Sequence, residues 1–514
     1  MKLRNLNISR LSFPFAAAIA ALSALASAPP ASAATWVPLT AGPHSWDSNA
    51  NWTNPATFVN AVGDIALMNG NLSTGQTVNL NQTITLGSLT VGDSSGTSTT
   101  MLQQGSAGSL VFDQTGTGNA FLTRTAGGTG TVTLNANLAF SLKDNLVVNT
   151  ASAMTINGII SSDLGIGITK IGTGALTLGG TNTYSGATVL GATGSVASAG
   201  TTTVSGTTGT INTSSGYTIN GSGSILSLTN TAGNLDRLND AATVTLNLGG
   251  ALSLVHNTTN NTTETVANLV LGIGSGTVTV SSAASRVTTL AVTGALTRTN
   301  KATALVRGTS LTQSVSTNVA RITLGTVPTG SDFVGTNTLS GGGVGDATQS
   351  LKIIPWLLGD SSATGTGNNF VTYDSTLGLR VLTVAQGTVL TDASTTATDP
   401  ENAIGFSGAV TAPDLTVNSL LFRSASQILD GSGALTVNSG AVATVSSGAG
   451  IGSGFSSLVL GNGEGILTAT GSNVLTINTP VNVTSSGGLT KNGGGTVILT
   501  ASNLYTCLLY TSDA

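Results

Sequence analysis

Apolar residues occupy every second position in many short segments of this chain, and each segment ends at Gly, Asn or Ser. The stretches 131–140 (TVTLNANLAF), 243–254 (TVTLNLGGALSL) and 277–280 (TVTV) show this alternation. Because side chains of a strand point alternately to its two faces, the pattern predicts strands that each bury one face. No useful window has the spacing of an amphipathic helix. The sequence therefore predicts an all-β protein.

The turn signals recur too often, and the strands are too short and too numerous, for one closed two-sheet core. We therefore predict a right-handed parallel β-helix, that is, a β-solenoid; tandem β-sandwich domains are the alternative. With about 22 residues per turn, the mature chain would form roughly 20 turns. At about 4.8 Å per turn, these would make one continuous rod near 100 Å long.

One unit of the pattern occurs twice, at 168–188 (ITKIGTGALTLGGTNTYSGAT) and 489–506 (LTKNGGGTVILTASNLYT). In each copy a Lys is followed by two glycines, which fit a turn that needs positive φ, then by a short strand and a corner with Asn and Tyr. The Tyr is expected to close an apolar flank while its hydroxyl stays in water. The shared positions are Lys170, Gly172, Gly174, Leu176, Leu178, Asn182 and Tyr184, and Lys491, Gly493, Gly495, Val497, Leu499, Asn503 and Tyr505.

This unit resembles the autotransporter-associated β-strand repeat, also called the passenger-associated transport repeat. The first copy matches through Gly186 and Thr188, and the second departs where Cys507 stands in place of a glycine. The resemblance implies the passenger region of a protein exported by type V secretion to the cell surface of a Gram-negative bacterium. It implies the secretion machinery and an outer-membrane translocator as partners, and adhesive contact with surface glycans or matrix.

The two ends of the chain carry their own signals. Lys2, Arg4 and Arg10 precede the apolar run 11–25 and the small residues 31–33, so residues 1–33 are predicted to be a secretory signal peptide. At the other end, 507–514 (CLLYTSDA) resembles a translated sequencing adapter. We therefore expect a chain truncated before its membrane anchor, which in relatives is a β-barrel or a sorting signal with a hydrophobic helix.

Changes in residue composition along the chain predict further structural divisions. Residues 34–92 contain Trp36, Trp46 and Trp52 and are predicted to cap the first turn of the solenoid, with a sugar-stacking platform as the alternative. Residues 93–308 read as solenoid with the first repeat, 309–382 as an atypical turn or insertion, and 383–506 as solenoid ending in the second repeat.

Charged residues are 7% of the chain and the net charge is −4, so the sequence lacks the basic stripe that nucleic-acid binding needs. Little chemistry is available either. We expect no catalytic, metal or cofactor site and no enzyme activity, although a β-helical polysaccharide-active enzyme is the alternative. The residues that could carry chemistry are His44 and His256, the formal G-x-S-x-G at 92–96, the isolated acids Asp113, Asp144, Asp163, Asp332, Asp346 and Asp360, and two groupings that we interpret as a polar loop (Asp236, Arg237, Asp240) and a turn (Asp399, Glu401).

Overall fold

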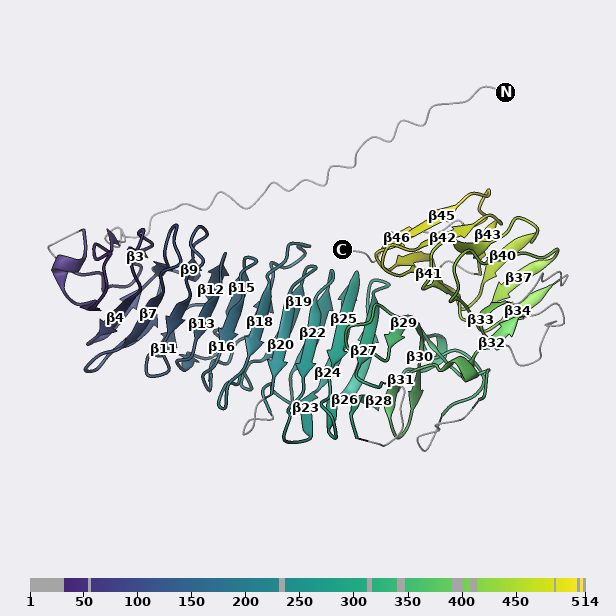
Figure 1. Cartoon of the computed structure of the whole chain (residues 1–514), viewed down its shortest axis with the longest axis horizontal. Coiled ribbons are helices and arrows are strands. Elements are labelled where there is room, and N and C mark those ends of the chain that lie inside the picture. The colour runs from purple at the N-terminus through teal and green to yellow at the C-terminus, as the bar shows by residue number, and fades with distance from the viewer. Residues whose placement is uncertain are drawn as a thin grey trace, which may run out of the picture.

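The protein forms two stacks of parallel β-strand turns joined by a connector (Figure 1). The computed structural model describes residues 32–53, 57–230, 236–311, 317–339, 347–390, 401–406, 414–484, 487–505 and 509–511. Within these residues the turns number about 15, and the only helices are three short 3-10 helices. We call the turns from β1 to β28 the first stack and those from β32 to β46 the second stack.

The first stack has three faces in its early turns, each made of strands paired with their equivalents one turn away. The face A strands are β1 (Ala33–Thr35), β3 (Ile65–Met68), β6 (Ser88–Val91), β9 (Ala120–Arg124), β12 (Leu146–Thr150), β15 (Ile168–Ile171), β17 (Thr188–Leu190), β19 (Gly216–Asn220), β21 (Thr243–Asn247), β24 (Asn268–Ile273) and β26 (Val287–Arg298). The face B strands are β2 (Pro43–Ser45), β4 (Gln76–Leu80), β7 (Thr100–Gln104), β10 (Val132–Leu134), β13 (Met154–Ile156), β16 (Leu176–Leu178), β18 (Thr201–Val204), β20 (Ile225–Thr229), β22 (Ala251–Val255), β25 (Ser275–Val280) and β27 (Thr303–Gly308). The third face is β5 (Thr83–Leu86), β8 (Ser109–Phe112), β11 (Ala139–Leu142) and β14 (Ile160–Ser162), while β23 (Thr262–Val266) and β28 (Val319–Thr326) flank β26.

The second stack also has three faces. They are β32 (Thr388–Leu390), β33 (Asn402–Phe406), β35 (Ser419–Phe422), β38 (Ala441–Thr444), β41 (Gly465–Ala469), β44 (Leu489–Asn492) and β46 (Leu509–Thr511); β34 (Leu415–Val417), β37 (Ala434–Val437), β40 (Ser457–Leu460) and β43 (Val481–Val483); and β36 (Ile428–Leu429), β39 (Ala449–Ile451), β42 (Val474–Ile477) and β45 (Thr496–Leu499). The 3-10 helices are η1 (Asn49–Asn51), η2 (Gly330–Asp332) and η3 (Val384–Gln386).

The alternation seen in the sequence places side chains in columns that run along each stack. In face A the inward column is in register from turn to turn, and almost all of it is aliphatic and buried. Its members from β3 to β24 are Ala66, Leu89, Leu122, Val148, Lys170, Leu190, Ile219, Leu246 and Leu271. Stacking of like aliphatic side chains thus makes the core, and the hydrophobic effect holds successive turns together.

The connector breaks the parallel pattern. It contains β29 (Ile354–Asp360), β30 (Asn369–Asp374) and β31 (Gly378–Val381), which pair antiparallel with one another. Every residue of these three strands is buried, including Trp356. The strands lie within the segment 309–382 that the sequence marked as atypical, although β28 of the same segment still pairs parallel with β26.

The prediction of a parallel β-solenoid is confirmed, and tandem β-sandwiches are wrong because strands pair parallel throughout both stacks. The prediction of one continuous rod of roughly 20 turns is also wrong. The apolar core is divided between the two stacks, with a third cluster at the connector. Many turns contain more than the assumed number of about 22 residues, such as the turns that end at Ile219, Leu246 and Leu271. The connector also adds residues without adding turns.

Some predictions fall on residues outside the described ranges. Of the predicted signal peptide 1–33, only Ser32 and Ala33 are described, and Thr506 and Cys507 are not. Of the adapter-like segment 507–514, Leu509–Thr511 are described and form β46, which pairs with β44 as a further strand of the second stack. In the described part of the chain, no helix has the length and apolar character that a membrane span requires.

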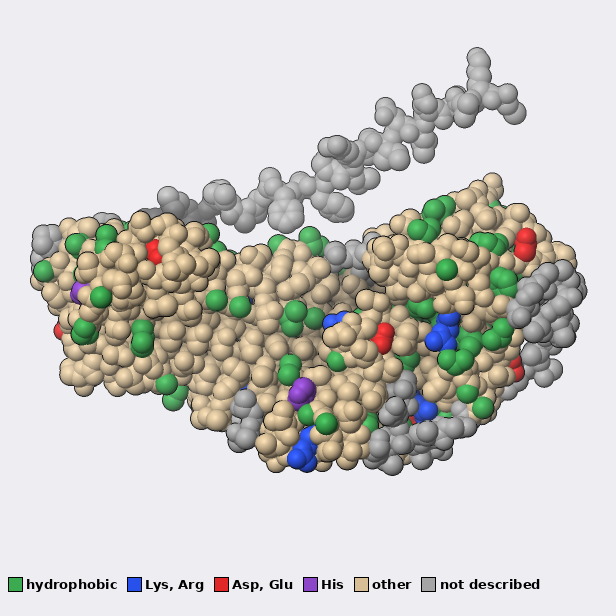
Figure 2. All heavy atoms as spheres, viewed as in Figure 1, with side chains coloured by type: hydrophobic (Ala, Val, Ile, Leu, Met, Phe, Trp, Pro, Cys, Tyr) green, Lys and Arg blue, Asp and Glu red, His purple; other side chains and the backbone are tan. Residues whose placement is uncertain are grey.

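The surface carries few charges. In Figure 2, polar uncharged side chains and backbone make up most of the visible face, with Lys, Arg, Asp and Glu as isolated spots. Stacking suits this composition, because like charges at the same register of successive turns would repel one another.

Candidate functional site

The two sequence repeats form the same corner, and a lysine lies inside each of them. Lys170 continues the inward column of face A, between Val148 and Leu190. In the second stack the equivalent column contains Lys491 next to Leu467. Alternation along the strand therefore directs both repeat lysines toward the core, at positions that other turns fill with aliphatic side chains.

The ammonium group of Lys170 binds the backbone of the corner. Nζ donates to the carbonyl oxygens of Ile171 (3.0 Å) and Gly172 (2.7 Å) in its own turn and of Ala199 (2.5 Å) in the next turn. The side chain is 1% exposed, and this burial lowers the pKa of Lys170 to about 8. At pH 7 the ammonium form still predominates, and only that form has three N–H groups to donate. Lys170 thus ties two consecutive turns together from within.

The glycines of the corner are required for two different reasons. Gly172 and Gly493 have φ of +78° and +79°, as the sequence predicted. For Gly174 and Gly495 the same prediction is wrong, because neither has positive φ. A Cβ at Gly174 would instead lie 2.5 Å from the carbonyl oxygen of Ser152 in the preceding turn. Close approach between turns therefore excludes a side chain there.

The Asn of the repeat connects each corner to the preceding turn. Oδ1 of Asn182 accepts the N–H of Ile160 at 3.0 Å, and Oδ1 of Asn503 accepts the N–H of Val481 at the same distance. The residue after each Asn bonds to the same neighbour. The Thr183 N–H donates to the carbonyl oxygen of Ile160 at 2.8 Å, and the Leu504 N–H donates to that of Val481 at 2.9 Å. The two copies therefore share one hydrogen-bonding pattern with their neighbouring turns.

The Tyr of the first repeat is more deeply buried than predicted. Tyr184 is fully buried and its hydroxyl lies 2.7 Å from Oγ1 of Thr188, so the expectation of a hydroxyl in water is wrong. Thr188 in turn lies within 3.0 Å of Oγ of Ser214 one turn later, which completes a buried hydroxyl chain. Tyr505 of the second repeat is partly buried and packs against the core of its stack.

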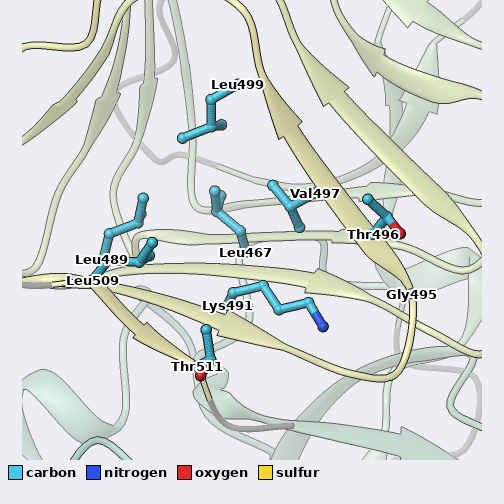
Figure 3. Close-up of a pocket in the computed structure, with 9 residues that line it drawn as sticks. All are labelled: Leu467, Leu489, Lys491, Gly495, Thr496, Val497, Leu499, Leu509 and Thr511. Carbon is cyan, nitrogen blue, oxygen red and sulfur yellow. The ribbon is translucent and has the colours of Figure 1, made fainter.

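The last repeat lines a cavity of about 350 Å³ (Figure 3). Lys491 lies beside the aliphatic side chains of Leu467, Leu489 and Val497, and its Nζ donates to the carbonyl oxygen of Gly493 as Lys170 does to Gly172.

The remaining repeat residues of the two strands differ in burial: Leu176 and Leu178 are in the core, whereas Val497 and Leu499 are partly buried. Gly186 of the first copy approaches the backbone of Ile166 and Gly167, where a Cβ would lie 2.4 Å from both.

A scan against protein-family models and searches of curated proteins and of solved structures found no match to this chain.

The three tryptophans of the amino-terminal segment pack together inside the first turns. Trp36, Trp46 and Trp52 are 3%, 0% and 2% exposed, and the rings of Trp46 and Trp52 are 4.8 Å apart. Each indole N–H has an acceptor: Gln76 for Trp36, the Val59 carbonyl for Trp46 and the Trp46 carbonyl for Trp52. Stacking on a sugar requires an exposed ring face, and none of the three has one. The three rings belong to the apolar core of the first stack.

Sequence reasoning missed two more buried cations in the described part of the first stack. Arg124 donates through its guanidinium to the carbonyls of Thr125, Gly128 and Gly130, all within 2.9 Å. Arg237, which the sequence assigned to a polar loop, is fully buried and donates to the carbonyl oxygens of Thr229 in its own turn and of Gly206 in the preceding turn. Arg124 could have been found from the alternation of β9, where residues 120, 122 and 124 face inward. A buried cation at a corner is therefore a recurrent device in the first stack.

Glu264 is the clearest buried acid of the first stack. It is fully buried, and its Oε1 accepts the N–H groups of Leu238 (2.6 Å) and Arg237 (3.1 Å). Burial is the main cause that raises the pKa of Glu264, from an ordinary 4.5 to about 8. The folded state thus holds a proton that the unfolded state releases between these two values. This contribution to stability is complete below pH 4.5 and is lost as the pH rises through about 8.

We expect Glu264→Gln to keep the acceptor oxygen and remove this pH dependence. The gain in the free energy of unfolding over the wild type should be larger at pH 8 than at pH 5, by on the order of 1–3 kcal/mol. Thermal unfolding at the two pH values measures it. Asp163→Asn, at an exposed acid of the same stack, is the control. A gain at pH 5 equal to that at pH 8 would contradict the prediction.

The histidines and the residues of the hydrolase-like motif make local contacts in the structure. His44 Nε2 lies 3.0 Å from the carbonyl oxygen of Thr40, and His256 Nδ1 lies 3.4 Å from Oγ of Ser281. Within the motif at 92–96, Asp93 is buried and accepts backbone N–H groups, and the next element is strand β7 rather than the helix of a nucleophile elbow.

The acids of the third face are closer together than the sequence indicated. On successive turns of this face, β8 is followed by Asp113, β11 by Lys143 and β14 by Asp163. Asp144 comes directly after Lys143. Burial raises the pKa of Asp113, and the charge of Asp144 raises it further. Asp163 pairs with Lys143 at 3.0 Å, and Asp144 accepts the N–H of Gln114. The description of these acids as isolated is therefore wrong, although no group of three potential metal ligands occurs among the described residues.

Proposed function

We propose that this chain is a structural and adhesive passenger region, similar to those of autotransporters, that is secreted and extends from the surface of a Gram-negative bacterium. The observation that carries the proposal is the parallel solenoid itself, with the repeat corner used twice in the same hydrogen-bonded form. A solenoid lengthens by adding turns, and its stability is the sum of turns and contacts between neighbours. This is the construction of a spacer rather than of a compact catalyst.

The same construction suits export of an unfolded chain. Each completed turn offers a strand edge on which the next turn pairs, so folding can proceed from one end. Folding on the far side of a membrane would then draw the chain out without ATP, as the resemblance to passenger repeats implies. The outer-membrane translocator and the secretion machinery are the partners that this route requires.

The surface supports contact through many weak interactions. Thr and Ser form an outward row in register along face B, from Thr133 through Thr177 to Ser253. Such rows, with few charges around them, can exchange hydrogen bonds with neutral surfaces such as glycans or matrix, and repeated weak contacts add through effective concentration. We infer that the chain binds without catalysing a reaction.

Exposure on intact cells tests the proposal. Antibodies against the first stack should label producing cells without permeabilisation, and added protease should remove the signal. Amino-terminal sequencing of the protein should begin at Ala34. Labelling only after lysis would contradict the proposal, as would a retained amino terminus.

The acids Asp113, Asp144 and Asp163 keep the β-helical polysaccharide-active enzyme as a second candidate, because such enzymes use carboxylates on neighbouring turns. Incubation with neutral and acidic polysaccharides, with and without Ca²⁺, is expected to release no new reducing ends. Turnover that Asp113→Asn abolishes would replace the structural proposal with the enzymatic one.

A further inference from the structure

The two stacks touch through a charged contact that involves a small part of each. Arg298 ends β26 of the first stack, and Glu464 immediately precedes β41 of the second. The Arg298 guanidinium donates to the Glu464 carboxylate, and the two side chains are only 14% and 6% exposed. Lys301 Nζ lies 3.5 Å from the same carboxylate. In a protein with 7% charged residues, this is a marked concentration of charge.

The same arginine also contacts the connector. Its Nε lies 3.7 Å from Oδ1 of Asp332, next to the connector, and its guanidinium lies 5.5 Å from the ring of Trp356 on β29. The indole N–H of Trp356 donates to Asp332 at 2.8 Å. Arg298 therefore joins the first stack, the connector and the second stack at one point.

The rest of the contact is mainly polar. Thr303 Oγ1 of β27 donates to Oδ1 of Asn492 at 2.7 Å, and Asn462 donates to the carbonyl of Ser331 at the same distance. Beside it a groove of about 190 Å³ separates the stacks, lined by Thr277 and Leu305 of the first and by Thr468, Thr470 and Gly471, among others, of the second. Among the described residues of the second stack, only Ile466 belongs to the apolar cluster of the first stack.

This contact lies where the second stack turns back toward the first. Figure 1 shows the second stack running back from β32 toward β46, which lies above the end of the first stack. The hydrogen bond between β27 and β44 agrees with that view. The second stack is therefore folded back, and the protein is shorter than two stacks placed end to end.

We propose that Arg298 and Glu464 form an ionic latch that holds the second stack folded back on the first, and that its release lets the second stack swing out on the connector. The protein then changes its length while both stacks stay folded. Each stack keeps its own apolar core and its own ladder of parallel strands, neither of which the latch side chains help to form. The swing has to part only the smaller cluster in which Leu351 and Ile353 pack against Leu421 of the second stack. This inference does not depend on where the protein resides or on what it contacts.

Removing the negative charge should open the latch. In Glu464→Gln, Arg298 and Lys301 would lose the carboxylate that they share in a largely buried place, which is unfavourable, and only the half-exposed Asp332 would remain beside Arg298. Small-angle X-ray scattering of the full chain is expected to show a maximum dimension larger by about 20 Å, the length of four turns at about 4.8 Å per turn, since two faces of the second stack have four strands. Far-UV circular dichroism is expected to stay unchanged.

Asp163→Asn removes the same charge from the exposed pair with Lys143 within the first stack and is the matched control, with the maximum dimension of the wild type. Arg298→Met opens the contact from the other side and should also lengthen the protein. If Glu464→Gln loses strand signal, Arg298→Met decides the question. Wild-type dimensions in a folded Glu464→Gln, or failing that in a folded Arg298→Met, would overturn the latch.

Discussion

Lys170→Met is expected to lower the free energy of unfolding of the first stack by about 2–4 kcal/mol. The substitution keeps an unbranched apolar stem in the inward column, but it removes the donor for three corner carbonyls. A buried carbonyl without a partner costs about 1–3 kcal/mol, and part of this is recovered by rearrangement of the corner. Urea unfolding followed by circular dichroism measures the loss.

Two further lysine variants test whether the loss of stability in Lys170→Met comes from the buried position of this lysine. Lys143→Met removes an exposed lysine of the same stack, where an ion pair with Asp163 is worth little, and its effect should stay within about 0.5 kcal/mol. Lys491→Met probes the corner of the second copy, whose side chain lines a cavity, and should cost less than Lys170→Met. Equal losses for Lys143→Met and Lys170→Met would show that the carbonyl contacts do not stabilise the stack.

Trp46→Ala is expected to destabilise the first turns by about 3–5 kcal/mol, the usual cost of deleting a large buried aromatic side chain. The indole is fully buried, packs against Trp52 at 4.8 Å and Trp36 at 6.4 Å, and leaves the Val59 carbonyl without its donor when removed. Because turns of a solenoid interact only with their neighbours, the damage should concentrate in β1 to β4. Amide hydrogen exchange, resolved by peptide, measures it.

Phe121→Ala is the control for aromatic deletion. This side chain points outward from β9 and is 40% exposed, so its removal should affect exchange in the first turns very little. If Trp46→Ala left exchange in β1 to β4 at the wild-type level, the tryptophan cluster would not be what closes the amino-terminal end of the core.

The candidate site was predictable in its positions and less so in its contacts. Alternation places Lys170 in phase with the buried Ile168, so its inward direction could be read from β15, but a lysine in a strand is ordinarily assigned to the solvent face. The sequence predicts the wrong reason for glycine at position 174, namely positive φ instead of close approach between turns. Positive φ is a property of one residue, whereas the approach of Ser152 depends on the preceding turn.

Sequence by itself determined the strands, their buried faces and the parallel stacking, because alternation with period two and corner glycines are local properties that repeat along the chain. Only the tertiary structure decided that the turns divide into two stacks, that Ala199 completes the lysine corner, and that Glu464 meets Arg298. These contacts join residues 29 and 166 positions apart. No periodic pattern encodes such pairs, since they depend on the accumulated geometry of every turn between them.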